Sequence, residues 1–573
     1  MRHFLTLLLL ALISLPSAAQ TIAFEDVTVL PMDDDSDGDG VGDRILANAN
    51  VVVQDGLILA VGPAAMTPIP SGALTIPGHG RFLMPGLADM HVHIDHESDL
   101  GLYPAYGVTT VLNLRGLPQH LRWRAEIAAG QRFGPTLYTT GDYMDGDPPD
   151  MPTMMSFSTP EDAAASVVTQ KKAGYDFLKV YSELSEEQFL ATAAAAQLAG
   201  MAVVGHTSDN YGLETVLSGQ VNFAHIEQAA RYMDLEAESE EAEMKRLAQR
   251  IARSGATVTP NLGLHRAMVR MWDDLDALLG RPESRYLHPA IFGPFRRENN
   301  RYIRRSQERH ELMRDTLIPR WERLTLALHE AGVPLLAGTD APVAGSYPGS
   351  ALWEELEALT AAGLEPYDVL VAATAAPGRF IEKYVEKSER FGQVRAGYRA
   401  DLLLLEKNPL DDVRHVGQQA GVMLRGQWLP QAELQEGLEK RAADFASLAE
   451  AVLTFEKHLF AGELERAREV FQGVRSARPD AVLFSQYPPY FIGFRYLYGE
   501  DGFNEDPAQL RKALILYEMY AETYPEYHSS HDMLGKAYLA NGEIEKAVAS
   551  FERALAIHPH DPVAREELKK IQR

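Results

Sequence analysis

The sequence predicts an α/β protein with a (β/α)8 TIM barrel, a small discontinuous β-sandwich domain and an all-α C-terminal repeat region. Three observations support this fold class. Eight strand-like apolar runs alternate with helical stretches over residues 84–390, which is the pattern of βα units around a parallel sheet. Short apolar runs separated by Gly, Pro and Asp flank that part at residues 20–83 and 391–430. Residues 433–573 change to helix pairs with a repeated pattern.

Composition narrows the classes of function. The 573 residues include 54 Lys and Arg against 80 Asp and Glu, and the resulting net charge of −26 argues against a nucleic-acid partner. The hydrophobic content of 46% is ordinary for a folded protein. Because the sequence contains no Cys, disulfides, thiolate metal ligands and cysteine nucleophiles are excluded.

Residues 1–19 are typical of a secretory signal peptide. Arg2 and His3 precede an apolar run over residues 4–15, and small residues follow up to Ala19, after which we expect cleavage. The apolar run is too short for a permanent membrane span. We therefore expect an exported protein, periplasmic or secreted, without a membrane span.

The two β segments that flank the barrel have the same pattern. Residues 50–53 and 57–61 of the first segment are apolar runs bounded by turn residues, and residues 400–405 and 421–426 repeat this pattern in the second. We therefore expect the two segments to form one discontinuous domain.

The barrel prediction rests on strands and helix starts that alternate along the chain. Thr159 and Pro160 form a helix start followed by acidic residues, and Ser185 with Gln188 forms a capping box. The Arg-rich residues 234–323 are expected to add helices around the seventh βα unit. The eight predicted strands are residues 87–94, 108–114, 136–141, 176–181, 202–205, 221–225, 257–261 and 333–338.

The C-terminal region has the spacing of a tetratricopeptide repeat. Small and large residues recur at the packing positions and a Pro follows each second helix, although a plain helical hairpin is an alternative. We expect this region to dock on the barrel or to bind a protein partner. The pattern is carried by Leu534, Gly535, Tyr538, Ala547, Phe551, Ala554 and Pro559, and by Ala513, Tyr517 and Pro525 about 34 residues earlier.

His91 and His93 lie at the end of the first predicted strand. Residues two apart on a strand point to the same side, so both imidazoles face one spot. This geometry suits a metal ion, although hydrogen bonds can also satisfy such a pair.

Four more candidates lie at or just after the ends of other predicted strands, namely Lys179, His206, His225 and Asp340. The carboxyl ends of barrel strands meet at one rim, so we expect these side chains to converge on the histidine pair. His and Asp are ligands of zinc and similar divalent ions. A protonated Lys179 would repel a dication, so it must be deprotonated or chemically altered if it joins the cluster.

The predicted ligands lie within longer motifs at residues 85–93, 338–340, 373–377 and 397–402. With these motifs the chain resembles the amidohydrolase superfamily, specifically the members similar to imidazolonepropionase and Xaa-Pro dipeptidase. The resemblance covers residues 21–430. It implies a metal-dependent hydrolase on a (β/α)8 barrel that acts on carbon–nitrogen bonds.

The resemblance also implies a ligand set for two divalent ions, which we expect to be Zn2+. One ion would be held by His91, His93 and Asp340 and the other by His206 and His225, with Lys179, carboxylated by CO2, as the bridge. Two such ions generate hydroxide from water at neutral pH and polarise a substrate carbonyl. Asp340 is then the catalytic residue, which accepts the proton of that water and passes it to the leaving amine.

The substrate implied by the resemblance is a small-molecule amide or a dipeptide-like compound. Arg115, Tyr143, Tyr181 and His265 follow predicted strands and are the candidate substrate-binding residues. An Arg can clamp a carboxylate, and Tyr or His can donate to a developing oxyanion.

Two other functions stay open at this point. The first is a mononuclear deaminase or cyclic-amide hydrolase, and the second is an inactive barrel that serves as a scaffold through its repeats. The presence of all six ligands at strand ends argues against the scaffold.

The acidic residues from Asp35 to Asp43 resemble a calcium loop. Position twelve of such a loop is Leu46 here, so the bidentate Glu is missing. A bound Ca2+ and a solvated acidic hairpin tip are therefore the two interpretations of this segment.

Overall fold

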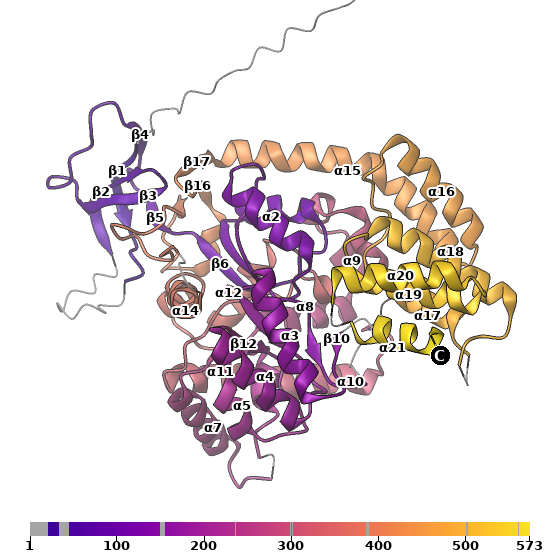
Figure 1. Cartoon of the computed structure of the whole chain (residues 1–573). Coiled ribbons are helices and arrows are strands. Elements are labelled where there is room, and N and C mark those ends of the chain that lie inside the picture. The colour runs from indigo at the N-terminus through magenta and orange to yellow at the C-terminus, as the bar shows by residue number, and fades with distance from the viewer. Residues whose placement is uncertain are drawn as a thin grey trace, which may run out of the picture.

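The computed structural model describes residues 21–33, 45–148, 155–234, 236–297, 300, 302–385, 389–499, 502–559 and 561–572. The predicted signal peptide and residues 35–43 of the predicted calcium loop lie outside these residues. Figure 1 shows three parts: a β layer, a central α/β body and a stack of C-terminal helices. None of the helices that the structure describes is both long and apolar enough to cross a membrane.

The two flanking β segments form one eight-stranded sheet with the order β17-β16-β15-β5-β1-β2-β3, in which β4 pairs with β1. The late strand β15 pairs antiparallel with β5, which joins the late segment to the early one. Alternate residues such as Phe24, Leu402 and Leu404 share one buried core. The strands are β1 (Ile22–Val29), β2 (Leu46–Gln54), β3 (Leu57–Pro63), β4 (Leu74–Pro77), β5 (Phe82–Pro85), β15 (Leu402–Leu405), β16 (Gln419–Leu424) and β17 (Gln427–Pro430).

The central body contains two further parallel sheets, β6-β7-β8 and β10-β9-β11-β12-β13-β14. Strands form at seven of the eight predicted positions, while β9 and β10 are short additions after the third. The strands are β6 (Leu87–Val92), β7 (Val108–Asn113), β8 (Thr136–Thr139), β9 (Met144–Asp145), β10 (Met155–Ser156), β11 (Phe177–Val180), β12 (Ala202–Gly205), β13 (Gln220–Ala224) and β14 (Thr257–Thr259).

The eighth predicted strand, residues 333–338, is not a regular strand in the structure. Pro334 lies inside it, and a Pro cannot donate to a strand ladder. A single parallel bridge at Leu335 nevertheless connects this segment to β14, and a second bridge at Ala341, shortly after the segment, connects the chain to β6. A third bridge, at Thr140, connects the end of β8 to β11. These bridges complete a ring of eight parallel segments, as the barrel prediction requires.

Helices alternate with the barrel strands. The predicted caps are present: the Thr159 hydroxyl accepts from the Asp162 backbone amide, and Ser185 and Gln188 form a reciprocal capping box. As the sequence predicts, additional helices follow β14. The helices of this part are α1 (Leu102–Ala105), α2 (Pro118–Ala128), α3 (Pro160–Ala173), α4 (Glu186–Ala199), α5 (Leu213–Gly219), α6 (Ile226–Ala230), α7 (Glu240–Ser254), α8 (Leu262–Asp273), α9 (Leu275–Leu279), α10 (Gln307–Leu312), α11 (Ile318–Glu330), α12 (Ala351–Ala361), α13 (Pro366–Ala372) and α14 (Ala375–Tyr384).

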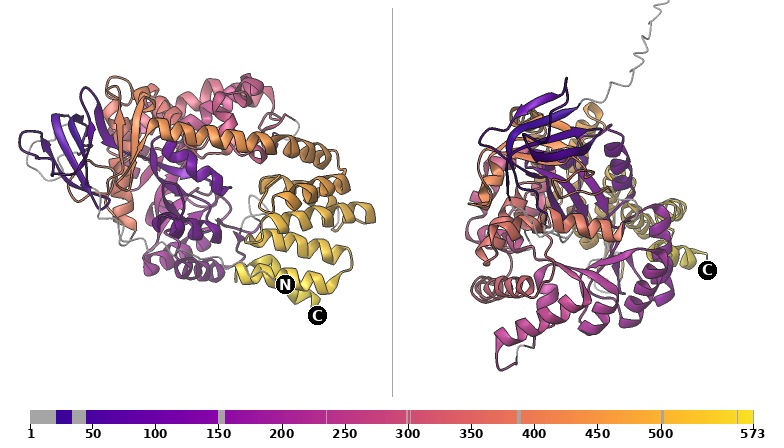
Figure 2. Two further views of the ribbon diagram at one scale, coloured as in Figure 1. Left: turned by 90° about the horizontal axis from the view of Figure 1, so that it is seen from above. Right: turned by 90° about the vertical axis from the view of Figure 1, so that its left-hand side faces the viewer.

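The long helix α15 (Gln431–Phe460) connects the β layer to the C-terminal helices. It runs along one side of the barrel and ends at the helical stack (Figure 2). Leu434 and Leu438 near its start pack into the core of the barrel, and Val452 and Phe455 near its end pack into the core of the stack. The stack consists of α16 (Leu464–Ala477), α17 (Tyr487–Leu497), α18 (Pro507–Thr523), α19 (His528–Ala540), α20 (Ile544–Ile557) and α21 (Pro562–Ile571).

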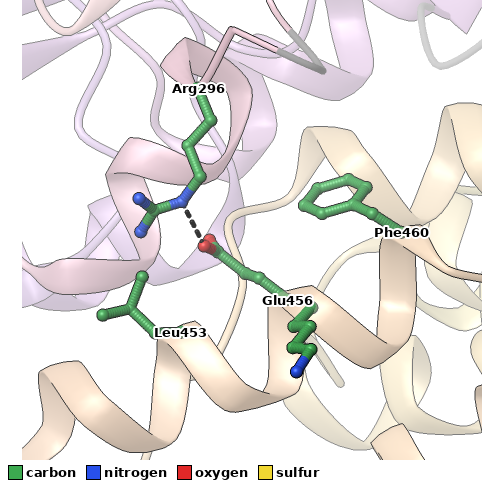
Figure 3. A pocket seen from close by; sticks show the side chains of 5 residues that line it. Arg296, Leu453, Glu456 and Phe460 are labelled. Carbon is green, nitrogen blue, oxygen red and sulfur yellow. Dashed lines mark hydrogen bonds and ion pairs between the residues drawn. The ribbon is translucent and has the colours of Figure 1, made fainter. Parts of the chain in front are cut away.

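An ion pair fastens α15 to the barrel. Glu456 Oε2 lies 2.6 Å from Arg296 Nε, which follows the short helix η3 (Pro289–Phe295). Burial raises the pKa of Glu456 to about 7, although the charge of Arg296 opposes this shift. The pair borders a cavity of about 340 Å³ that is separate from the predicted ligands (Figure 3). Its lining residues are Arg296, Leu453, Glu456, Lys457 and Phe460.

Helices α19 and α20 pack together at the positions that the repeat pattern predicts. A Cβ atom on Gly535 would lie 2.6 Å from Phe551 Cε1, which is closer than real side chains approach. Ala547 and Ala554 on the same face of α20 are fully buried. The small residues of the repeat therefore let the two helices approach closely.

This packing predicts opposite effects for two mid-helix glycines. Gly535→Ala is expected to lower the midpoint of urea unfolding, because the new methyl group meets the Phe551 ring. Gly473→Ala in α16 is the matched control, because a Cβ there meets no atom within 4 Å. That control is expected to raise stability by about 1 kcal/mol through helix propensity. A higher midpoint for both variants would contradict the packing argument.

Candidate metal centre

The six predicted ligands come together at one rim of the barrel. His91 lies in β6 and His93 just after it, and Lys179 lies in β11. The other three, His206, His225 and Asp340, follow β12, β13 and the eighth segment. All except the partly exposed His206 are buried. The parallel ring places these strand ends side by side, as predicted from the sequence.

Asp340 is the point at which the first three ligands meet. Its Oδ1 atom lies 3.1 Å from His91 Nε2 and 2.8 Å from His93 Nε2. Its Oδ2 atom lies 4.0 Å from His225 Nε2. One ligand atom each from His91, His93 and Asp340 lies within 4.8 Å of the others, a spacing that can accommodate a metal ion.

The remaining ligands extend the cluster. The ring centroids of His91 and His225 are 4.6 Å apart, and those of His206 and His225 are 5.1 Å apart. Gly205 leaves space for the Lys179 side chain, since a Cβ atom there would lie 2.8 Å from Lys179 Cδ. Four imidazoles, one carboxylate and one amine therefore form a continuous group.

Burial and charge set the protonation of these groups. Burial lowers the pKa of His91 and of His206 well below the usual range, and the neighbouring Lys179 lowers both further. Burial also lowers the pKa of Lys179 to about 7, although Asp340 opposes this shift. For Asp340 burial alone would raise the pKa, but its interactions with the neighbouring imidazoles outweigh burial and hold the pKa well below its usual value. Burial thus disfavours the cationic forms of His91 and His206, while Asp340 is held in its ionised form.

Backbone geometry turns three side chains at this rim. Asp340, His225 and Asn261 have positive φ angles of 56°, 77° and 55°, which are uncommon for residues other than Gly. The Asp340 backbone amide donates to the His91 carbonyl at 2.7 Å, which ties the eighth segment to β6. Asn261 was not among the predicted site residues; it is fully buried at the end of the seventh predicted strand.

Asp89 supports the metal centre through hydrogen bonds and was not among the predicted site residues. Its carboxylate accepts hydrogen bonds from the Thr339 hydroxyl at 2.7 Å and the Thr339 amide at 3.0 Å. It also accepts from the His91 amide at 3.3 Å. Burial raises the pKa of Asp89 to about 7. The place of Asp89 in the motif before His91 was a signal in the sequence. Only these hydrogen bonds show that Asp89 links the segment that carries His91 to the segment that carries Asp340.

The donor set fits a divalent cation. Within the described residues, His91 Nδ1 and Nε2, His225 Nδ1 and Asp340 Oδ1 are buried without a hydrogen-bond partner. Buried polar atoms are normally satisfied, and nitrogen and carboxylate oxygen are the atoms that Zn2+ and similar ions bind. A cation at this position would satisfy these atoms.

The four candidate substrate residues differ in how directly they contact the predicted ligands. The Tyr143 hydroxyl lies 3.4 Å from His93 Nδ1, and the Tyr181 ring stacks on His206 with centroids 3.9 Å apart. Arg115 packs over the Tyr143 ring at 5.7 Å. His265 Nε2 lies 3.1 Å from the Glu227 carboxylate. The two tyrosines therefore contact predicted ligands directly, Arg115 contacts one of these tyrosines, and His265 pairs with Glu227 instead.

The C-terminal helices contact the same rim. Arg115 Nη2 donates to the Tyr527 hydroxyl at 2.7 Å, and Leu117 is part of the core of the helical stack. His528 Nε2 lies 2.9 Å from Asp142 Oδ2. Arg115 and Tyr527 are 412 positions apart in the sequence, so no local pattern could have predicted their contact.

Comparison with protein families agrees with this geometry. A model of the amidohydrolase family matches residues 107–429. The chain belongs to the amidohydrolase family. It is thus a metal-dependent hydrolase that acts on carbon–nitrogen bonds, which confirms the predicted class. A tetratricopeptide-repeat model matches residues 528–571, which confirms the predicted repeat.

Solved structures resemble the amidohydrolase chain over about three quarters of its length. Bottromycin amidohydrolase is 26% identical with a TM-score of 0.58, covering 74% of this chain and 90% of its own. A candidate prolidase from Bifidobacterium longum is 25% identical with a TM-score of 0.55, covering 74% of this chain and 100% of its own.

The barrel fold extends to more distant structures. A Xaa-Pro dipeptidase with bound methionine is 17% identical with a TM-score of 0.54, covering 72% of this chain and 100% of its own, and shares the fold. These likenesses confirm the predicted TIM-barrel-like architecture. No curated protein matches the chain.

Proposed function

We propose that this amidohydrolase is an exported, binuclear zinc enzyme that hydrolyses an amide or peptide-like bond in a small molecule. The observation that carries the proposal is the meeting of His91, His93 and Asp340 with His206, His225 and Lys179 at one buried rim. These six side chains offer more ligand atoms than one four-coordinate zinc ion requires.

The proposed ligand assignment places one ion on His91, His93 and Asp340 and the other on His206 and His225. Carboxylation of Lys179 by CO2 would turn the only cationic ligand into an anion with two oxygens. The burial of Lys179 favours this, because burial disfavours its ammonium form and the neutral amine is the form that reacts with CO2. When bound, the ions supply an acidified water and a polarised substrate carbonyl.

Asp340 is the residue that we assign to proton transfer. Its ionised carboxylate can accept the proton of the attacking water and deliver it to the leaving nitrogen, which makes it first a general base and then a general acid. The hydrogen bonds from Thr339 to Asp89 fix the backbone next to Asp340, so the Asp340 carboxylate keeps its orientation.

The rim residues favour a polar, dipeptide-like substrate. The Tyr143 hydroxyl lies beside His93, where it can donate to the oxyanion that develops on the substrate carbonyl. The positive charge of Arg115 next to Tyr143 favours a substrate with a carboxylate. Structurally similar proteins include a candidate prolidase, which supports testing Xaa-Pro dipeptides first.

The test of the function is a substrate screen with N-acyl amino acids, Xaa-Pro dipeptides and lactams. Wild-type protein loaded with Zn2+ is expected to release an amine from the first or second class. Asp340→Asn keeps the shape of the side chain and is expected to lower kcat roughly 10²- to 10⁴-fold, because it removes the proton acceptor. Activity on lactams alone, or deamination with release of ammonia, would contradict the proposed substrate class.

The binuclear site is tested by metal analysis. Lys179→Ala is expected to remove at least one of the two zinc ions assigned to the catalytic centre, because the bridge is lost. Lys171→Ala on the surface of α3 is the control and is expected to keep both ions. Acetate or propionate added to Lys179→Ala should restore part of the activity by supplying a carboxylate. Unchanged metal content in Lys179→Ala would refute the bridge.

Export is tested by expressing the whole chain in a secretion-competent bacterium. We expect the protein in the periplasm or medium with Gln20 as its first residue, because residues 1–19 have the pattern of a signal peptide. Cytoplasmic protein that still begins at Met1 would contradict export.

A further inference from the structure

A second buried cluster lies in the C-terminal repeats. His528 begins α19, Asp532 lies one turn later on the same helix, and Asp561 is the N-cap of α21. Their exposed fractions are 5%, 4% and 1%. One ligand atom from each lies within 4.8 Å of the others, and the only other such group in the described part of the chain is the catalytic set.

Two carboxylates converge on one ring nitrogen of this cluster. His528 Nδ1 lies 2.6 Å from Asp561 Oδ2 and 3.6 Å from Asp532 Oδ2. A single N–H on Nδ1 can serve one of these acceptors well, but not both. Among the described residues, Asp532 Oδ1 is buried and has no hydrogen-bond partner. The cluster therefore contains more acceptor atoms than donors.

Outer contacts hold each of these side chains in place. The second ring nitrogen of His528 lies 2.9 Å from Asp142 Oδ2, on the loop after β8. Asp561 Oδ1 accepts from the Ala564 backbone amide at 2.9 Å, so its other oxygen faces His528. A metal-binding His typically donates its second ring N–H to a carboxylate in this way.

The charges point in the same direction. Asp142, Asp532 and Asp561 place three carboxyl groups around one imidazole. Ionised carboxylates in a buried site are costly unless they are paired, and a bound cation would pair with them.

We propose that His528 Nδ1, Asp532 and Asp561 bind a divalent cation of the zinc class, with Asp142 orienting the imidazole. One nitrogen and two carboxylate ligands suit Zn2+ or Mn2+. The ion would join α19 to α21 and, through His528 and Asp142, fasten the repeats to the barrel rim. This site shares no residue with the catalytic centre and does not depend on the proposed substrate or reaction.

The experiment measures zinc by mass spectrometry in full-length protein that has been loaded with Zn2+ and then dialysed. His91→Ala/Asp340→Asn serves as the background, because these substitutions remove ligands of the catalytic centre. The ion of the second cluster can be assigned by comparing this background with and without Asp532→Asn. We expect the added substitution to remove one further zinc per chain.

Two variants separate loss of a ligand from loss of the fold. Asp561→Asn removes the anionic ligand but keeps the helix cap, since Asn caps helices about as well as Asp, and it should also lose one zinc. Asp506→Asn changes the N-cap of α18, where the carboxylate accepts from the Ala508 amide, and should keep the wild-type content. Wild-type crystals measured at the zinc edge should show an anomalous peak beside His528 Nδ1.

Equal zinc contents with and without Asp532→Asn, or no anomalous peak at His528, would overturn the proposal. Either result would identify the cluster as an imidazole–carboxylate contact between the repeats and the barrel that needs no metal.

Discussion

Closure of the parallel strand ring is the constraint on which the site depends. Each ligand lies at or just beyond the carboxyl end of a different segment, and only a closed ring brings the first and the eighth segments together. The contact between Asp340 and the pair His91 and His93 is made across that closure. A break in the ring would separate the carboxylate from both imidazoles and remove the metal centre.

Burying the polar side chains of the metal centre costs free energy when no cation is bound. Hydrogen bonds from the surrounding fold nevertheless hold these side chains in place. Asp89 binds the backbone of His91 and of Thr339 and so fixes the two segments that carry the ligands. Gly205 and Gly338 keep space beside Lys179 and His91, where any side chain would collide. The backbone and these outer contacts therefore orient the ligands before a metal ion binds, which is the arrangement expected of a rigid metal site.

The C-terminal repeats belong to the same structural unit as the barrel. Helix α15 packs into the barrel core at its start and into the helical core at its end. Tyr527 and His528 reach the loops that carry Arg115 and Asp142, next to the candidate substrate residue Tyr143. The face of the repeats around Tyr527 and His528 is thus occupied by the barrel rim, so a protein partner would have to use another face.

The sequence by itself determined the fold class and the repeat, and it placed the six candidate ligands at or just after the ends of predicted strands, because each of these follows from patterns within short segments. Alternation of strands and helices, the His91 and His93 pair on one strand, and Gly535 opposite Phe551 are patterns within short segments. The tertiary structure alone decided that Pro334 reduces the eighth strand to bridges, that Asp89 and Asn261 border the centre, and that Arg115 contacts Tyr527. Contacts between residues hundreds of positions apart depend on how whole elements pack, and side-chain spacing along the chain does not record that packing.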